Sequence, residues 1–232
     1  MAEEHSQRIQ TSLLNGVEKK ALVWLADRQP RWVTSDILTL AGTLGAVIIA
    51  AGYILSNYNI QFLWLASFGF IVNWYGDSLD GTLARVRNQQ RPVYGFYLDH
   101  TVDAVNEVLM FVGAGLSPFI NFSLALGLLV VYLMLSLNVS MNAHLKNEFK
   151  LTYAKLGPTE FRLIVIIFNT ILLCVPAWAT RVKTCIWFGH EWSVHALDYA
   201  GFAILVILIV IYIVTIIHDA RDYARKDPMP QK

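Results

Sequence analysis

Apolar residues along the chain fall into six long segments that are separated by short charged connections. The segments cover residues 36–55, 61–85, 93–116, 122–143, 159–179 and 197–217. Each is close to the ~20 residues that a helix needs to cross a bilayer. The mean hydropathy of +0.48 and the hydrophobic content of 56% exceed those of an ordinary soluble domain. The pattern predicts an all-α fold: a polytopic membrane protein with six transmembrane helices.

A different pattern precedes the first of these segments. Ile9, Leu13, Val17, Ala21 and Leu25 recur every four residues, with polar and charged residues between them. This spacing predicts an amphipathic helix that lies in the membrane surface, and a helix packed on the loops of the bundle is the alternative. We therefore divide the chain into an interfacial part (1–33), a six-helix transmembrane domain (34–220) and a tail (221–232).

The positions of the basic residues predict how the helices are oriented. Of the 18 Lys and Arg residues, sixteen lie before the first segment, after the last one, or around the second and fourth connections. Because Lys and Arg accumulate on the cytoplasmic side, both termini are expected in the cytoplasm. We expect an integral protein of a cell membrane, such as a bacterial inner membrane. The net charge of +1 creates no general attraction to nucleic acid, so no nucleic-acid partner is expected.

Four aspartates lie inside two of the apolar segments. Asp77 and Asp80 are three residues apart, and Asp99 and Asp103 are four apart, so each pair occupies one face of its helix. The short connection at 88–92 predicts that the two helices are antiparallel neighbours, with the pairs at similar depth near the cytoplasmic side. Charged groups inside a membrane are costly and typically mark function. A buried ionic network or a set of helix caps is the structural alternative.

Carboxylates that converge at one depth repel one another unless cations lie between them. Oxygen ligands suit Mg²⁺ or Mn²⁺ rather than zinc. Two such ions, ~4 Å apart, can clamp a diphosphate. Gly81 and Ala84 leave a smooth helix surface for a ligand, and Arg85 can bind a phosphate with its fork of donors. The candidate chemistry is therefore metal-assisted phosphoryl transfer.

These residues and their spacing resemble the signature of the CDP-alcohol phosphotransferase family. The matching positions are Asp77, Asp80, Gly81, Ala84, Arg85, Gly95, Asp99 and Asp103. The resemblance implies a membrane enzyme of phospholipid biosynthesis that moves a substituted phosphate from a CDP-linked donor to a hydroxyl group and releases CMP. The donor would be CDP-diacylglycerol or a CDP-aminoalcohol, and the acceptor a small polar alcohol or a lipid.

The resemblance also implies a role for each matching residue. The residues that bind two metal ions would be Asp77, Asp80, Asp99 and Asp103. Asp103 would also be the general base that deprotonates the incoming hydroxyl. The nucleotide-binding residues would be Asp36, Gly81, Ala84, Arg85 and Gly95. At Asp36 the chain departs from the family, which usually has Pro-Asn where this sequence has Ser35 and Asp36.

Three further residues bear on which alcohol is used, and they point to different acceptors. His100 follows Asp99 directly, a pattern similar to the choline and ethanolamine phosphotransferases, and its imidazole can share the base role. Arg162 is similar to the arginine that holds the acceptor's phosphate in inositol-phosphate enzymes. Glu107 continues the four-residue step from Asp103. We therefore expect Arg162 and Glu107 to bind the acceptor.

Two other functions fit parts of the pattern. An intramembrane Mg²⁺-dependent prenyltransferase also uses aspartates on a diphosphate, but its acidic motifs normally lie far apart in sequence, whereas here they lie within 27 residues. A cation transporter with intramembrane carboxylates predicts discontinuous helices and paired repeats, which are not visible.

Small residues in the third apolar segment bear on assembly. Gly113, Ala114 and Gly115 permit close contact between helices. In line with the family, we expect a homodimer through this patch or through the fourth segment.

Overall fold

A computed structural model describes residues 7–9, 14–146, 148–150, 157–175, 177, 183–187, 190–195 and 197–229. Over these residues the fold is mostly helical, as predicted, and each of the six apolar segments contains a helix. The helices begin close to the predicted residues, but α6 ends five residues before the predicted end and α8 extends nine residues beyond it. The helices are α1 (Asn15–Asp27), α2 (Ser35–Leu55), α3 (Leu63–Val86), α4 (Pro92–Gly115), α5 (Phe122–Lys146), α6 (Pro158–Cys174) and α8 (Asp198–Lys226). A 3₁₀ turn, η1 (Ile60–Phe62), precedes α3.

Three of these helices are long and apolar enough to cross a membrane by length and composition: Ser35–Leu55, Phe122–Ala143 and Asp198–Lys226. Helix α6 has 17 residues, and residues 176, 178 and 179 of its predicted segment lie outside the described part. Helices α3 and α4 carry the aspartates, whose charge lowers the hydropathy of otherwise apolar helices.

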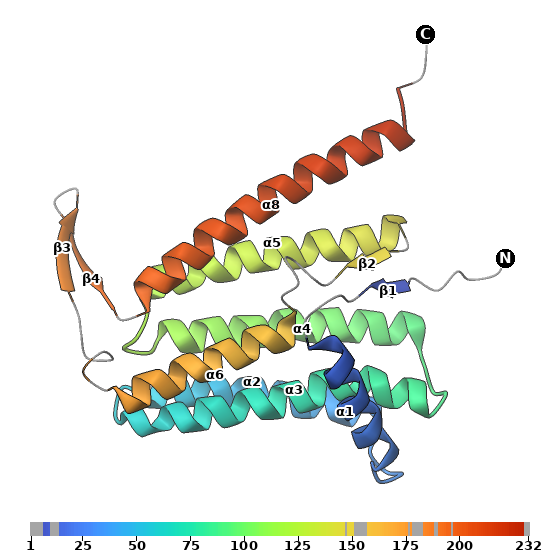
Figure 1. Ribbon diagram of the computed structural model, residues 1–232, viewed down its shortest axis with the longest axis horizontal. Coiled ribbons are helices and arrows are strands. Elements are labelled where there is room, and N and C mark those ends of the chain that lie inside the picture. Colours follow the sequence, from blue (N-terminus) through green and yellow to red (C-terminus); the bar gives the residue numbers. More distant parts are fainter. Residues whose placement is uncertain are drawn as a thin grey trace.

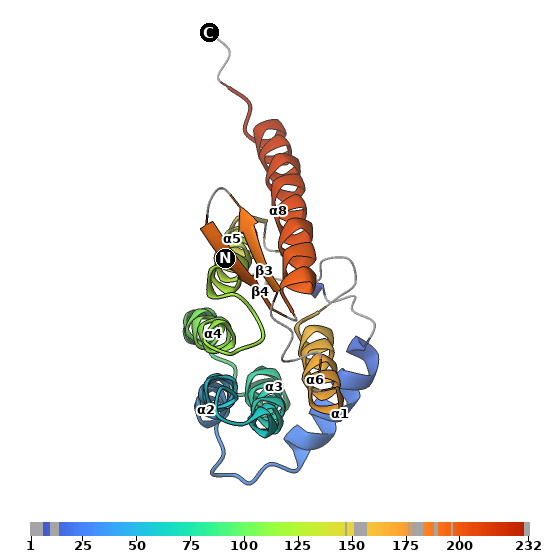
Figure 2. The same ribbon diagram turned by 90° about the vertical axis from the view of Figure 1, so that its left-hand side faces the viewer.

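The helices form a bundle in which α2 to α6 lie side by side (Figure 1). Helix α2 packs along both α3 and α4, α5 packs on α4, and α6 packs on α3. Helix α8 packs on α5 and diverges from the remaining helices, and α1 lies across α3 and α6 (Figure 2). Only 6% of the most apolar stretch of α8 is buried, so this helix contributes little to the protein core.

Helices α2 and α3 approach so closely that their backbones touch. A Cβ atom at Gly45 would lie 2.3 Å from the backbone nitrogen of Asn73, and one at Gly76 would lie 2.2 Å from the nitrogen of Gly42. Small residues at such positions allow two helices to pack backbone to backbone within a membrane. The contact places α3, which carries two of the aspartates, directly on α2.

The small residues predicted to form a dimer interface are buried within the chain instead. A Cβ at Gly113 would lie 2.5 Å from the Cα of Ala50 on α2, and one at Gly115 would lie 2.9 Å from side-chain atoms of Phe122 and Ala125. The proposed interface at residues 113–115 is therefore wrong, because these glycines let α4 pack against α2 and α5. A patch of small residues indicates close packing but does not identify the partner helix.

Helices α3 and α4 run antiparallel, as the short connection predicts (Figure 1), but they pack mainly on α2 and make few close backbone contacts with each other. The connection contains Asn88, which has a φ of 54°, a left-handed conformation that asparagine tolerates better than most residues. The aspartates therefore meet from two helices that are both mounted on a third.

Two clusters of buried side chains flank the aspartates along the bundle. At one end, Leu22 and Ala26 of α1 pack with Leu79 and Leu83 of α3. Toward the other end, the buried residues of α2, α3 and α6 include Ile49, Tyr53, Leu63, Ala66, Phe70 and Leu172. Packing in these two clusters fixes the positions of the helices, and the polar residues lie between the clusters.

Helix α1 differs in part from the helix predicted near the N-terminus. Ile9 lies in a short strand, β1 (Gln7–Ile9), rather than in the helix. Leu22 and Ala26 face the bundle, whereas Val17 and Trp24 are exposed. The packed face is thus offset from the predicted stripe, because Leu22 and Ala26 fit against α3.

Short strands were not predicted, and the residues that the structure describes contain four. Strand β1 pairs in parallel with β2 (Glu148–Lys150), and β3 (Lys183–Trp187) forms an antiparallel ribbon with β4 (His190–Val194). All lie outside the helices, so they leave the predicted helical core intact.

Candidate active site

Three of the four aspartates come together between α3 and α4. Asp77 on α3 and Asp99 and Asp103 on α4 are half-buried, and each offers a carboxylate oxygen within 4.8 Å of the others. Converging carboxylate oxygens are the ligand type that Mg²⁺ and Mn²⁺ prefer. The donor set thus fits a divalent cation, as the spacing predicts.

The fourth aspartate, Asp80, is bonded to α2. Its Oδ2 accepts a hydrogen bond of 2.7 Å from the hydroxyl of Thr39, and its Oδ1 accepts one from the backbone N–H of Gly81. The hydroxyl of Ser35 also donates to the backbone carbonyl of Asp80 at 2.9 Å. These bonds fix the orientation of a carboxylate that is 9% exposed. Thr39 was not singled out from the sequence, although it is a polar residue one turn after Ser35 in an apolar helix.

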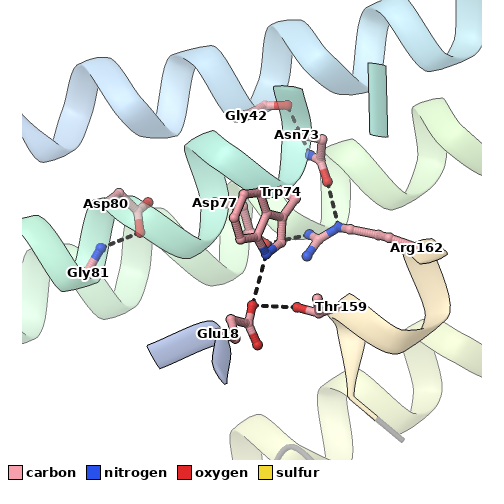
Figure 3. A network of polar contacts seen from close by, with 9 residues as sticks. All are labelled: Glu18, Gly42, Asn73, Trp74, Asp77, Asp80, Gly81, Thr159 and Arg162. Carbon is pink, nitrogen blue, oxygen red and sulfur yellow. Dashed lines mark hydrogen bonds and ion pairs between the residues drawn. The ribbon is translucent and has the colours of Figure 1, made fainter. Parts of the chain in front are cut away.

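Arg162 connects α6 to the aspartate cluster. Its Nη2 donates to Oδ2 of Asp77 at 2.5 Å, and its Nε donates to Oδ1 of Asn73 at 3.0 Å. Asn73 in turn donates to the backbone carbonyl of Gly42 at 3.0 Å, and Figure 3 shows this chain of contacts from α6 through α3 to α2. The structure thus places Arg162 in the candidate site, with its guanidinium directed at a predicted metal ligand.

A second polar network holds α1 against the same end of the site. Oε1 of Glu18 accepts hydrogen bonds from Nε1 of Trp74 at 2.9 Å and from the hydroxyl of Thr159 at 2.5 Å (Figure 3). The backbone N–H of Leu14 donates to Oε1 of Glu160 at 3.0 Å. Helix α1 is therefore joined to both α3 and α6 beside Asp77 and Arg162.

Two buried polar groups continue the site along α4. Asn106 is 4% exposed and Glu107 is 9% exposed. Among the described residues, Oδ1 of Asn106 and Oε2 of Glu107 have no hydrogen-bond partner. They follow Asp103 by three and four residues, so they lie about one helical turn further along the helix. Unpaired buried oxygens are rare, and they indicate that a ligand or water completes their bonding.

The predicted nucleotide-binding residues lie along a more open part of the two helices. A Cβ at Gly95 would meet nothing within 4 Å, and one at Gly81 would meet only the end of the Arg85 side chain, at 3.6 Å. Ala84 is half-buried on the same helix as Gly81. Asp36, at the start of α2, is exposed and forms an ion pair of 3.8 Å with Arg91. The structure thus leaves space beside both glycines for a ligand.

His100 is turned toward its own helix. Its Nδ1 lies 2.9 Å from the carbonyl oxygen of Phe96, and its ring stacks on the Phe96 ring with centroids 4.1 Å apart. Because a carbonyl oxygen only accepts hydrogen bonds, Nδ1 must carry the proton of the neutral ring, and Nε2 is then the basic nitrogen. The Nδ1 atom is also 3.8 Å from Oδ2 of Asp99.

Known proteins of lipid synthesis share parts of this sequence. Phosphatidylinositol phosphate synthase of Cutibacterium acnes is 36% identical over 84 residues, which cover 36% of this chain and 38% of that protein. Cholinephosphotransferase 1 of Gallus gallus is 27% identical over 203 residues, which cover 80% of this chain and 54% of that protein. The chain thus spans about half or less of the length of these curated relatives. Residues 32–220 match the family model described as CDP-alcohol phosphatidyltransferase, and this integral membrane protein therefore belongs to the CDP-alcohol phosphatidyltransferase family.

Proposed function

We propose that this protein is a CDP-alcohol phosphotransferase of phospholipid biosynthesis. It would transfer a substituted phosphate from a CDP-linked donor to a hydroxyl group and release CMP. The observation that carries the proposal is the meeting of Asp77, Asp99 and Asp103, which occupy signature positions of the family that the chain matches over residues 32–220.

The proposed metal ligands are Asp77, Asp80, Asp99 and Asp103, and two Mg²⁺ or Mn²⁺ ions are expected. The oxygen donors of the described cluster suit these cations. Bound there, such ions would neutralise the diphosphate and stabilise the negative charge on the departing CMP. Thr39 and the Gly81 N–H orient Asp80, so that this carboxylate needs little rearrangement when it binds.

The proton of the acceptor hydroxyl would pass to Asp103. The hydroxyl oxygen then forms a new bond to the phosphorus that carries the substituent, and the bond from that phosphorus to the oxygen shared with CMP breaks. CMP leaves with the electron pair of the broken bond. Nε2 of His100 is the second candidate for the base, because its Nδ1 is occupied by the Phe96 carbonyl.

The substrates would bind on either side of the aspartates. The nucleotide would contact Asp36, Gly81, Ala84, Arg85 and Gly95, and the open space beside the glycines supports this assignment. Arg162 would bind the alcohol that accepts the phosphate, since its guanidinium already lies in the site.

For the membrane arrangement, we propose six crossings, with both termini and the active site on the cytoplasmic side. Sixteen of the 18 basic residues lie on that side in this arrangement. Helix α1 would rest on the membrane surface with Val17 and Trp24, which are exposed, in contact with lipid.

A homodimer is proposed through α5. Its exposed apolar residues, at steps of three and four, are Val130, Met134, Leu137, Met141 and Leu145. A stripe of this kind fits the surface of a second helix. Mass measurement in a lipid bilayer tests this proposal, and a monomer would refute it.

The direct test of the function is an exchange reaction. Purified protein in lipid, with Mg²⁺, a CDP-linked donor and its acceptor alcohol, should incorporate labelled CMP into that donor, because in the reverse reaction CMP attacks the phosphorus of the product and releases the acceptor. Panels should contain CDP-diacylglycerol and CDP-aminoalcohols, and product lipids should be identified by mass. Exchange would separate this function from a prenyltransferase and from a cation transporter, neither of which forms CDP-linked products. Failure to exchange CMP with every donor would overturn the proposal.

A further inference from the structure

The unpaired carboxylate oxygen of Glu107 lies on the same side of α4 as the aspartate cluster. Asp99, Asp103 and Glu107 follow one another at four-residue steps, which places them in neighbouring turns of one helix face. Glu107 is 9% exposed, and its Oε2 has no hydrogen-bond partner among the described residues. Neither metal binding nor nucleotide binding explains the buried carboxyl group of Glu107.

Two aromatic rings lie near this carboxylate along α4 and α5. Phe111 follows Glu107 by one further turn, and its ring centroid lies 6.0 Å from that of Tyr132 on α5, with the ring planes at 46°. Tyr132 lies within electrostatic range of Glu107, and also of Arg162 and the aspartates Asp103 and Asp77. A buried carboxyl group and two ring systems from different helices therefore lie in one region of the bundle.

This combination selects for positive charge. The unpaired oxygens of Glu107 and Asn106 accept hydrogen bonds but do not donate them. A phosphate at this position would be repelled by Glu107, whereas an ammonium group would be attracted by the carboxylate and by the electron-rich faces of the rings. Carboxylates and aromatic rings together are a recurrent means of binding such cations.

The spacing along α4 fits a short aminoalcohol. Glu107 lies four residues, about 6 Å, beyond Asp103 along the helix axis, and a two-carbon aminoalcohol places its nitrogen roughly 5 Å from the phosphorus to which its oxygen is bonded. A phosphorus held beside the aspartates would thus bring the nitrogen next to Glu107.

We propose that Glu107, with Phe111 and Tyr132 nearby, binds the ammonium group of an aminoalcohol that is esterified to the CDP-linked donor. This inference rests on the proposed function and names its donor class. It replaces the acceptor-binding role that the sequence suggests for Glu107, and the acceptor hydroxyl would then belong to a lipid.

The test is calorimetric titration of the full chain in lipid nanodiscs with Mg²⁺ and no acceptor. The probes are CDP-choline, CDP-glycerol and CMP, which differ in the presence of an ammonium and of an alcohol. The wild-type protein should bind CDP-choline about tenfold more tightly than CDP-glycerol. Glu107→Gln should remove this preference while leaving CMP and CDP-glycerol binding within about twofold. Phe111→Leu should reduce the preference in part, and Asp227→Asn, a charge loss at an exposed site just after α8, should retain it.

The outcomes separate this inference from the function on which it rests. If the wild-type protein binds CMP and CDP-glycerol but shows no preference for CDP-choline, the ammonium site is refuted and the function stands. If Glu107→Gln weakens CMP binding as much as CDP-choline binding, Glu107 has a structural role and the inference is equally refuted. If no cytidine nucleotide binds, the proposed function fails first.

Discussion

The contact between α2 and α3 at Gly45 predicts a large effect from a single methyl group. A Cβ at Gly45 would lie 2.3 Å from the backbone nitrogen of Asn73, whereas ordinary contacts begin at 3.4 Å. In Gly45→Ala the two backbones must therefore separate by about 1.1 Å, since neither is a flexible side chain that can move aside. Overpacking of this kind costs about 1–3 kcal/mol, which corresponds to a fall in Tm of about 2–12 °C for a chain of this length.

The same displacement should reach the active site. Asn73 holds the Nε of Arg162, and Asp77, four residues along α3, holds its Nη2. A shift of about 1 Å in catalytic geometry lowers rates by about a hundredfold. Gly45→Ala should thus lose transfer activity at temperatures well below its Tm.

Thermal unfolding, detected by tryptophan fluorescence, measures the loss of stability. CMP exchange at about 20 °C measures the loss of transfer activity. Gly127→Ala on α5 is the matched control, because its added Cβ meets only side-chain atoms of Leu205, at an ordinary 3.6 Å. An unchanged Tm and rate in Gly45→Ala would show that α2 and α3 do not pack backbone to backbone.

Three further changes test individual parts of the site. Asp103→Asn should lower transfer by at least about a hundredfold while the protein still binds CDP-choline or CMP with metal, because the amide keeps an oxygen for the metal but cannot accept the proton; more than trace activity would transfer the base role to His100. Arg162→Gln should lower kcat more than it raises the KM of the donor, since the contacts of Arg162 are to Asp77 and Asn73. Steady-state kinetics with separate donor and acceptor series measure these constants. Equal changes in kcat and in KM would indicate that the residue is only structural. Thr39→Val should weaken Mn²⁺ binding by about tenfold, as judged by electron paramagnetic resonance titration, because a hydrogen bond to a charged group contributes about 1.5 kcal/mol; affinity equal to that of wild type would remove the orienting role of Thr39.

The residues that the sequence predicts well are related by short distances along the chain. Apolar runs locate the helices because a bilayer requires about 20 apolar residues. The convergence of Asp77 with Asp99 and Asp103 follows from helical spacing and one short connection, which together fix side and depth. Local periodicity was therefore sufficient to predict the aspartate cluster.

The specific contacts in and around this aspartate cluster could not be predicted because they join distant segments. Thr39 and Asp80 are 41 residues apart, Arg162 and Asp77 are 85 apart, and Glu18 and Thr159 are 141 apart. The periodicity of polar residues indicates which face of each helix is polar. Which helices become neighbours is determined by packing at residues such as Gly45. For the same reason, the sequence indicated that residues 113–115 form a tight contact without identifying α2 as the partner.

The length and exposure of α8 have a consequence for the lipid around the enzyme. Its 29 residues extend about 44 Å, whereas the hydrocarbon core of a bilayer measures about 30 Å. Little of this helix packs on the bundle, and its polar contacts with α5 include hydrogen bonds from Asn138 and Asn142 to Asp219. Its tilt can therefore change with membrane thickness by rotation about these contacts. Thickness changes should thus be absorbed by rotation of α8 on α5, while the catalytic groups on α3, α4 and α6 keep their spacing in bilayers of different composition.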